Sequence, residues 1–288
     1  MSRFVAAEYL ENIHRLALGI EPVDAVSERG LMQPVRVDIE RGVPHSMKRT
    51  DAPYCVLQSF GRVPDSLCRH PSGRYVLLYY PGIADKVILR IYDHSRYYVP
   101  RRLRVPLMSP EEWKELEKTE LLQSNRHRLQ RRPYLFPGAA YPVSSGATGL
   151  RGRVERDGQP MRWAFIEAKL PDIDQVIGQA RSDDRGEFFL VLSPGAALVD
   201  LFRTFLVEIW ISGPAASPEP DPTDIRDYDQ LWDLPLEVPE EQVGLGAPDN
   251  VSAGDIPPEN YITVSQSVVL ELGRILSCEV EPFIFTAS

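Results

Sequence analysis

The sequence predicts a mainly β protein in which two related β-sandwich domains are joined by a linker helix. The first observation is a repeat, because residues 69–82 (RHPSGRYVLLYYPG) align without a gap with residues 182–195 (SDDRGEFFLVLSPG) and Gly73 falls on Gly186. A strand–turn–strand unit that occurs twice indicates two related β domains. The second observation is the proline content, 26 of 288 residues, which favours strands and turns over long helices.

The first domain is expected to span residues 1–107. Its clearest strand is residues 34–40, where apolar side chains alternate with charged ones, so that one face is buried and the other solvated. Residues 97–107 carry prolines, which cannot donate to a ladder, so this segment is expected at a sheet edge. Residues 16–20 could belong to a helix or form a strand. Further strands are expected at residues 54–60, 74–80 and 86–92.

A linker, residues 108–148, is expected to follow. Its helix begins with an N-cap at Ser109, a proline at the first helical position and two glutamates against the positive end of the helix dipole. The helix is expected to end in a basic last turn before Pro133. Beyond it, a segment rich in Pro, Gly and Ser predicts an extended connector that docks its aromatic side chains on a neighbouring surface. These side chains are Tyr134, Phe136 and Tyr141.

The second domain is expected at residues 149–212. An Asp-Gly pair at positions 157 and 158 predicts a hairpin turn after the first strand. The last strand matches its counterpart in the first domain, because FLVEIW resembles VILRIY at residues 87–92. The strands are expected at residues 149–156, 161–170, 175–180, 187–193 and 204–212.

The chain is expected to end in two further parts. Residues 213–260 form an acidic, proline-rich loop. Residues 261–288 form a C-terminal strand pair, in which Val268 and residues 270–272 could add an edge strand to either sheet.

Bulk properties limit the function classes. A net charge of −9 argues against general nucleic-acid binding. The sequence has no run of about 18 apolar residues that would span a membrane, and its N-terminus has no apolar signal-peptide core, so a cytoplasmic location is expected. The three cysteines favour reduced thiols, although Cys55 and Cys68 could pair.

A family resemblance covers residues 149–195. Its motif residues are Gly152, Val154, Ala164, Ile166, Ser182, Asp183, Gly186, Phe188 and Leu190. This pattern resembles a carboxypeptidase-regulatory-like domain, a small transthyretin-like or Ig-like β-sandwich. Residues 170–178 are longer and more polar than the minimal pattern. The first repeat copy resembles the family more loosely, because Arg69 and His70 replace Ser182 and Asp183.

The layout of the whole chain is similar to accessory proteins encoded with phage-tail-like contractile injection systems. The segments that carry this resemblance are residues 99–107, 135–154 and 183–192. The resemblance implies an assembly or cap component, with tail tube-like or sheath-like subunits as partners.

The sequence shows no catalytic constellation. The five histidines are scattered, no GxSxG motif is present, and SSGATG at residues 144–149 lacks the lysine of a P-loop. We therefore expect a non-enzymatic protein without cofactor or metal. Asp183 and Asp184 could bind calcium, but a solvated turn is the simpler interpretation.

An interface is expected where the repeat strands are apolar on both faces. Leaving such side chains in water forgoes roughly 1.5–3 kcal/mol each, so the connector, the linker helix or a partner subunit must cover them. The apolar candidates are Val76, Leu78, Tyr80, Phe189 and Trp232. The basic candidates are Arg101, Arg102, Arg128, Arg131 and Arg132. These arginines could pair with the acidic residues 213–260 of the same chain, or with those of another subunit in a head-to-tail contact. Alternatively, the basic and acidic residues could lie on two independently solvated faces.

Together these observations predict a structural or assembly component that binds copies of itself, other protein subunits or both, and neither nucleic acid nor membrane. The alternative is a carbohydrate-binding or cell-surface-binding module, in which exposed aromatic side chains stack on sugars. Its candidates are Trp163, Trp210, Tyr97 and Tyr98.

Overall fold

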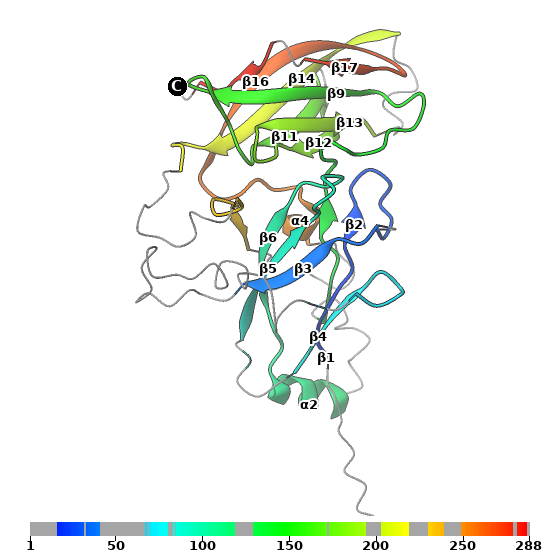
Figure 1. The fold of residues 1–288 in the computed structure, drawn as a ribbon, viewed down its shortest axis with the longest axis vertical. Coiled ribbons are helices and arrows are strands. Elements are labelled where there is room, and N and C mark those ends of the chain that lie inside the picture. Colours follow the sequence, from blue (N-terminus) through cyan, green and yellow to red (C-terminus); the bar gives the residue numbers. More distant parts are fainter. Residues whose placement is uncertain are drawn as a thin grey trace, which may run out of the picture.

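A computed structural model gives the fold of this chain. It describes residues 16–31, 33–40, 67, 69–79, 83, 85–118, 129–171, 173–193, 203–218, 230–238, 249–278 and 281–286. The strand expected at residues 54–60 lies outside the described residues, as do Cys55 and Cys68. The fold is mainly β, as predicted, and Figure 1 shows two β-rich halves stacked along the longest axis.

The lower half contains a hydrophobic core between two sheets. Its strands are β1 (Leu16–Ile20), β2 (Val23–Asp24), β3 (Arg36–Glu40), β4 (Tyr75–Leu78), β5 (Lys86–Tyr92), β6 (Arg101–Pro106), β7 (Gln130–Arg131), β8 (Tyr134–Leu135) and β15 (Leu236–Glu237). One sheet has the order β4-β1-β7 and the other β15-β6-β5-β3, while β2 and β8 form a separate pair. Apolar side chains from both sheets fill the core, among them Leu18, Leu77 and Leu89.

The upper half repeats this plan. Its strands are β9 (Gly149–Arg156), β10 (Gln159–Pro160), β11 (Phe165–Leu170), β12 (Ile173–Arg181), β13 (Glu187–Val191), β14 (Thr204–Pro214), β16 (Tyr261–Glu271), β17 (Ile275–Ser277) and β18 (Phe283–Ile284). One sheet has the order β10-β9-β13, with β17 and β18 also paired to β9, and the other β12-β11-β14-β16. A second core lies between them and includes Val154, Leu190 and Ile209.

Strand pairing is duplicated between the halves. The first strand pairs antiparallel with the repeat strand in both, as β1 with β4 and β9 with β13. The next strand pairs with the returning strand in the opposite sheet, as β3 with β5 and β11 with β14. The returning strand has a further neighbour, β6 below and β16 above. The structural repeat is therefore longer than the sequence repeat, because it includes strands whose sequences do not resemble each other.

The turn of the repeat has the same hydrogen bonds in both copies. Gly73 has φ +84° and donates its N–H to the His70 carbonyl, and Gly186 has φ +74° and donates to the Asp183 carbonyl. Residues 72 and 185 each donate a backbone N–H to a side-chain acceptor two residues earlier, His70 Nδ1 or Asp183 Oδ1. An imidazole nitrogen thus takes the place of a carboxylate oxygen, and glycine supplies the positive φ that both turns need.

Helix α2 (Pro110–Lys118) begins as the sequence predicts. Ser109 Oγ accepts from the Glu112 N–H at 3.2 Å and the Glu112 carboxylate accepts from the Ser109 N–H at 2.7 Å, which is a reciprocal capping box. The helix was expected to end in a basic turn that reaches Pro133. This is wrong for the last residues of that turn, because Gln130 and Arg131 form strand β7, which pairs with β1. Among the described residues no helix has the length and apolar character of a membrane span.

The structure corrects one expected edge and confirms another: β6 has a neighbour on both sides, whereas β16 is the edge strand that Val268 and Leu270 were expected to add. Residues 101–106 are not an edge strand, because β15 from the acidic segment pairs with β6 in parallel. The C-terminal strands do not pair with each other: β16 extends one sheet along β14, and β17 and β18 pair with β9 in the other. The acidic segment also contributes the short helix α4 (Asn250–Ala253). Its described parts are therefore built into the fold.

The charged face of β3 is buried, contrary to the solvated face expected from its alternation. Asp38 has no exposed surface, and Arg36 Nε donates to its carboxylate at 2.8 Å. Glu40 accepts two bonds from Arg102 and lies 3.7 Å from Arg90. Arg36 of β3 itself neutralises Asp38, and arginines from β5 and β6 neutralise Glu40, which allows the burial of both carboxylates.

Candidate interaction surface

Phe189 in the second repeat copy is covered by the chain itself. Its side chain has no exposed surface. The Arg151 guanidinium lies 3.9 Å from the centre of its ring, and the Tyr141 ring lies 6.3 Å away. Tyr141 belongs to the connector that was expected to dock its aromatic side chains. The prediction that both faces of this repeat strand are covered is confirmed for Phe189.

The corresponding face of β4 is open. Val76 is 40% exposed and Leu78 is 41% exposed, whereas Tyr75 and Leu77 on the other face are buried. Of the covers expected for this face, the connector and the linker helix therefore do not fully bury it in the first repeat copy, and a partner subunit remains the third alternative. Tyr141, which packs against Phe189 in the upper half, donates its hydroxyl to Asp24.

Leu16 extends this open face. It lies opposite Leu78 in the register of β1 and β4, and Gly19 lies opposite Val76. Trp113 of α2 donates its indole N–H to the Leu16 carbonyl at 3.0 Å, which holds the helix at the end of the strand. We call Leu16, Val76 and Leu78 the β4 patch. Leu16 is not among the interface residues predicted from the sequence, although the apolar run LALGI at residues 16–20 is typical of a strand.

A buried ion triad links the two halves. Arg101 donates from Nε and Nη2 to the Glu237 carboxylate at 3.0 and 2.6 Å, and Arg181 Nη2 lies 3.2 Å from the same carboxylate. Burial alone would raise the pKa of Glu237, but the two guanidinium groups lower it below its usual value. Because Arg101 belongs to β6 and Arg181 to β12, Glu237 ties the lower half to the upper one.

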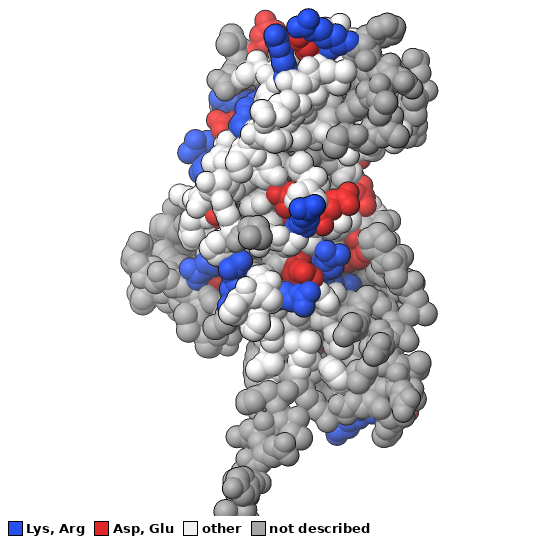
Figure 2. Space-filling model, turned by 90° about the vertical axis from the view of Figure 1, so that its right-hand side faces the viewer, with Lys and Arg blue, Asp and Glu red and all other residues white. Residues whose placement is uncertain are grey.

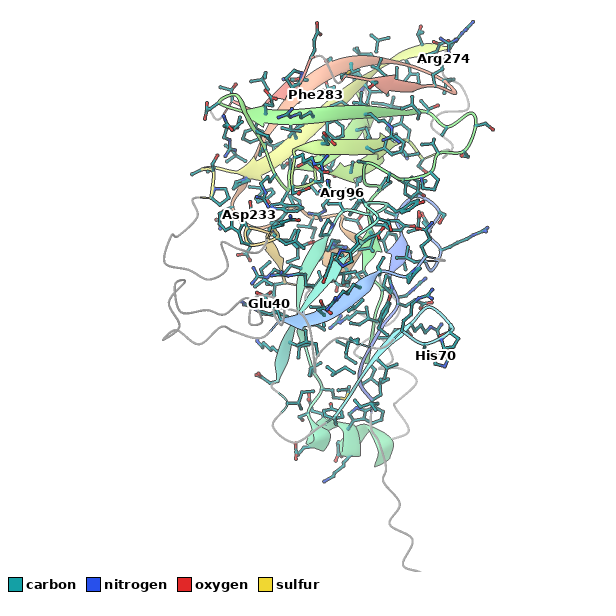
Figure 3. All side chains as sticks on the ribbon, in the orientation of Figure 1. Glu40, His70, Arg96, Asp233, Arg274 and Phe283 are labelled. Carbon is teal, nitrogen blue, oxygen red and sulfur yellow. The ribbon has the colours of Figure 1, made fainter. Side chains whose placement is uncertain are left out.

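Two further contacts cross the junction. Arg96, which lies between the halves in Figure 3, is 3.5 Å from Asp183 and 3.3 Å from Asp184 in the turn of the second repeat copy. Asp24 accepts hydrogen bonds from the hydroxyls of Tyr98 and Tyr141, both at 2.8 Å. Burial and the bond to Asp24 raise the pKa of both tyrosines, so they remain protonated donors. These contacts fix the connector between the halves.

The arginines predicted as interface candidates do not lie together on one surface. Arg101 and Arg131 are buried, and Arg131 lies 3.5 Å from Asp249 of the acidic segment. Both arginines therefore pair with acidic residues of the same chain, which is one of the three alternatives considered for the basic candidates. Arg102 bonds to Glu40, whereas Arg132 is about half exposed beside Glu21. Arg128 and Tyr80 lie outside the described residues, and Trp232 is half-buried.

Positive and negative side chains lie close together on the face that Figure 2 draws. Figure 2 shows blue and red side chains side by side across the middle of the molecule. This pattern agrees with ion pairs such as Arg162 with Asp233, at 2.8 Å. Opposite charges that lie this close leave no large field of one sign on the part of this face that Figure 2 colours.

The aromatic side chains considered for sugar binding mostly make contacts within the protein. Trp163 is buried and donates its indole N–H to Asp233 at 2.8 Å. Tyr98 donates to Asp24. Trp210 and Tyr97 are half-buried, and Lys169 Nζ lies 4.8 Å from the centre of the Trp210 ring. These four side chains therefore do not form one exposed aromatic platform.

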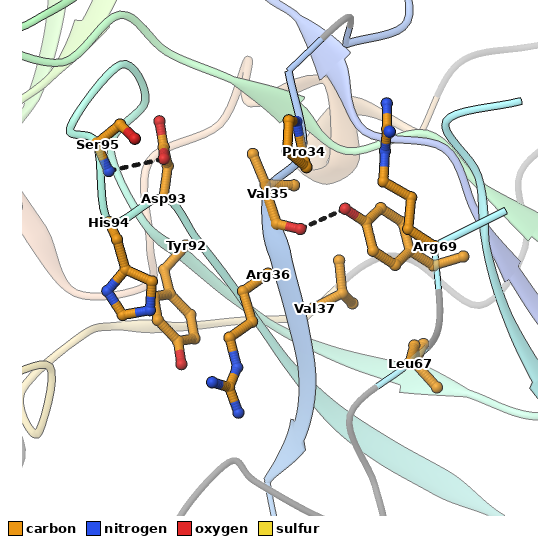
Figure 4. A pocket seen from close by; sticks show the side chains of 11 residues that line it. Pro34, Val35, Arg36, Val37, Leu67, Arg69, Tyr92, Asp93, His94 and Ser95 are labelled. Carbon is orange, nitrogen blue, oxygen red and sulfur yellow. Dashed lines mark hydrogen bonds between the residues drawn. The ribbon is translucent and has the colours of Figure 1, made fainter. Parts of the chain in front are cut away.

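A pocket of about 390 Å³ opens beside β3. Figure 4 shows Tyr92 and His94 on one side, Arg69 and Leu67 on the other, and Val35 on the strand between them. The Tyr75 hydroxyl donates to the Val35 carbonyl, and Tyr92 donates to Asp38 at 3.1 Å. Burial, with help from Asp38, raises the pKa of Tyr92 to about 12, so this phenol is not a base near neutral pH.

No metal site is evident in the described part of the chain, where no three His, Cys, Asp or Glu side chains cluster as ligands. The two aspartates considered for calcium, Asp183 and Asp184, instead face Arg96. The two candidate functional features of the structure are thus the β4 patch and the junction between the halves, which is held by ion pairs.

Comparisons of the chain with protein-family models, curated proteins and solved structures gave no match.

Proposed function

We propose that this protein is a non-enzymatic structural component that binds other protein subunits through the β4 patch. One observation carries the proposal: equivalent strands of the repeat are covered by the chain in the upper half and open in the lower half. Large apolar side chains that share one face are typical of protein interfaces. Burying such a side chain from full exposure contributes roughly 1.5–3 kcal/mol, and covering the exposed part of Val76 or Leu78 contributes a proportionate share of that.

The junction between the halves supports this role. The triad of Arg101, Glu237 and Arg181 is buried, so the contacts that join the halves exclude water. A part that connects subunits must hold its contact surfaces at a fixed angle, and hydrogen-bonded ion pairs specify such an angle. The sequence resemblance names the assembly: an accessory or cap protein of a phage-tail-like contractile injection apparatus, bound to tube-like or sheath-like subunits.

A double substitution at the patch tests the proposal. Val76→Glu with Leu78→Glu places charge on the open face and leaves Tyr75 and Leu77 in the core. Co-expressed with tube-like and sheath-like subunits, the wild type is expected to purify with at least one of them. The variant should bind at least about tenfold more weakly, because a covered carboxylate loses its hydration.

Val238→Glu is the matched control, because Val238 is 49% exposed and follows β15, which belongs to the other sheet of the lower half. It should bind like the wild type. Circular dichroism and thermal unfolding check that all variants fold. Equal binding by the patch variant and the wild type would refute the β4 patch as the docking surface.

A further inference from the structure

Strand β16 forms a long, open sheet edge. All eleven of its residues, Tyr261 to Glu271, pair with β14 in one uninterrupted antiparallel register. In the sheet order β12-β11-β14-β16 it is the last strand, and no described strand pairs with its other side. Such an edge offers a row of backbone donors and acceptors to another strand.

This edge lacks the features that usually prevent edge-to-edge pairing. The sequence of β16, YITVSQSVVLE, contains no proline, lysine or arginine, and its only charge is Glu271 at the end. The opposite edge of the same sheet is different, because the pairing of β12 with β11 shifts register twice, beside Lys169. Irregular pairing, charge and proline are the common protections of sheet edges. One edge of this sheet is thus protected and the other is suited to pairing.

The outer face of β16 is small, uncharged and exposed. Thr263, Ser265 and Ser267 are exposed on this face. They are followed by Val269, which is 60% exposed and lies opposite Leu206 of β14, itself 46% exposed. A strand added beside β16 would extend a face that already holds these apolar side chains.

The strand is complementary to itself. A second β16 can lie antiparallel to the first, with Gln266 opposite Gln266. In this register each β-branched residue lies opposite an apolar residue and each serine lies opposite a serine. No two like charges face each other. The opposed pairs are Tyr261 with Glu271, Ile262 with Leu270, Thr263 with Val269, Val264 with Val268, and Ser265 with Ser267. This register pairs all eleven residues, whereas any slip leaves residues unpaired. The symmetric contact is the isologous arrangement of a two-fold dimer.

We propose that two copies of this chain join edge to edge along β16, so that their two four-stranded sheets become one continuous sheet. The proposal deepens the assembly role above by naming one partner, a second copy, and a surface separate from the β4 patch. The backbone supplies the attraction along the whole edge, and the side-chain pairs set the register.

Charge-swapped variants test self-pairing. Ser265→Lys with Ser267→Lys places lysines opposite lysines across the dyad, and Ser265→Glu with Ser267→Glu does the same with glutamates. Sedimentation analysis over a concentration series should show a dimer for the wild type and a dissociation constant at least about 100-fold higher for each variant alone. An equal mixture of the two variants should recover the dimer, because lysine then faces glutamate.

The outcomes separate this inference from the proposed function. Val76→Glu with Leu78→Glu should keep the dimer mass and lose the other subunits. A wild-type chain that stays monomeric at every concentration, or a lysine variant that dimerises as tightly as the wild type, would overturn pairing through β16. A monomer that still binds tube-like or sheath-like subunits through the β4 patch would leave the proposed function in place.

Discussion

Glu237→Gln is expected to lower the free energy of unfolding by about 3–5 kcal/mol, the usual cost of removing one partner from a buried ion pair. The substitution keeps the size of the side chain and removes its charge. Arg101 and Arg181 then remain buried without their counter-ion, and both have 4% or less of their side chains exposed. Urea denaturation followed by tryptophan fluorescence measures the change.

Glu271→Gln serves as the control for this prediction. Glu271 pairs with Arg203, whose side chain is 79% exposed, so its loss should change stability by only about 0–1 kcal/mol. Similar effects of the two substitutions would show that the triad does not hold the junction.

The cost of Glu237→Gln should also depend on pH. The pKa of Glu237 lies below its usual value in the folded chain. A carboxylate of this kind adds stability above its unfolded pKa, about 4.3, and that stability is lost as pH falls through the folded value. The stability difference between wild type and variant should thus be full at pH 7 and shrink below about pH 4. A constant difference down to the acid limit of folding would contradict this explanation.

Gly186→Ala is expected to be strongly destabilising, by about 2–5 kcal/mol. The positive φ contributes about 1–2 kcal/mol and overpacking about 1–3 kcal/mol. A Cβ at this position would lie 2.6 Å from the Val154 carbonyl oxygen, so the backbone must move. The same unfolding experiment measures the change.

Gly73→Ala is the matched substitution in the other repeat copy. Its φ of +84° is just as unfavourable, but the nearest atom to an added Cβ is the Leu31 carbonyl oxygen at 3.4 Å. We expect a cost of about 1–2 kcal/mol, from the backbone alone. If alanine costs more at position 73 than at position 186, the close approach to Val154 is not what constrains the upper turn.

The repeat was visible in the sequence because local geometry fixes its residues. A glycine is required wherever the turn adopts positive φ, and both turns place one there, at Gly73 and Gly186. The serine and glutamate of the capping box, Ser109 and Glu112, are likewise three residues apart and readable without tertiary information. Turns and helix starts are local, and these two were predicted correctly.

The mistaken expectations all concern partners that are distant in the sequence. The charged face of β3 is buried because Arg102, 62 residues after Glu40, reaches it. The edge expected at residues 97–107 is covered by Leu236 and Glu237, which pair with Arg102 and Leu103. Alternation of apolar and charged residues identifies a strand but does not say whether a distant ion pair covers its polar face.

The open β4 patch could be predicted only in part. The two apolar faces of the strand were evident from its sequence, but the identity of the cover was not. Tyr141 reaches Phe189 because its hydroxyl is anchored on Asp24. In the first repeat copy Val76, the counterpart of Phe189, is 40% exposed. The connector that helps to cover Phe189 has no repeat of its own in the sequence, so the repeat alone could not predict this difference.

Site-specific photo-crosslinking tests the central claim, that the β4 patch docks another subunit, most directly. A benzophenone amino acid replaces Leu78 in one preparation and Val238, the exposed control, in another. Each chain is co-expressed with tube-like and sheath-like subunits, irradiated and analysed by mass spectrometry. We predict a cross-link from position 78 to one of these subunits and none from position 238. No cross-link from position 78, or equal cross-linking from both positions, would contradict the docking surface proposed for this protein.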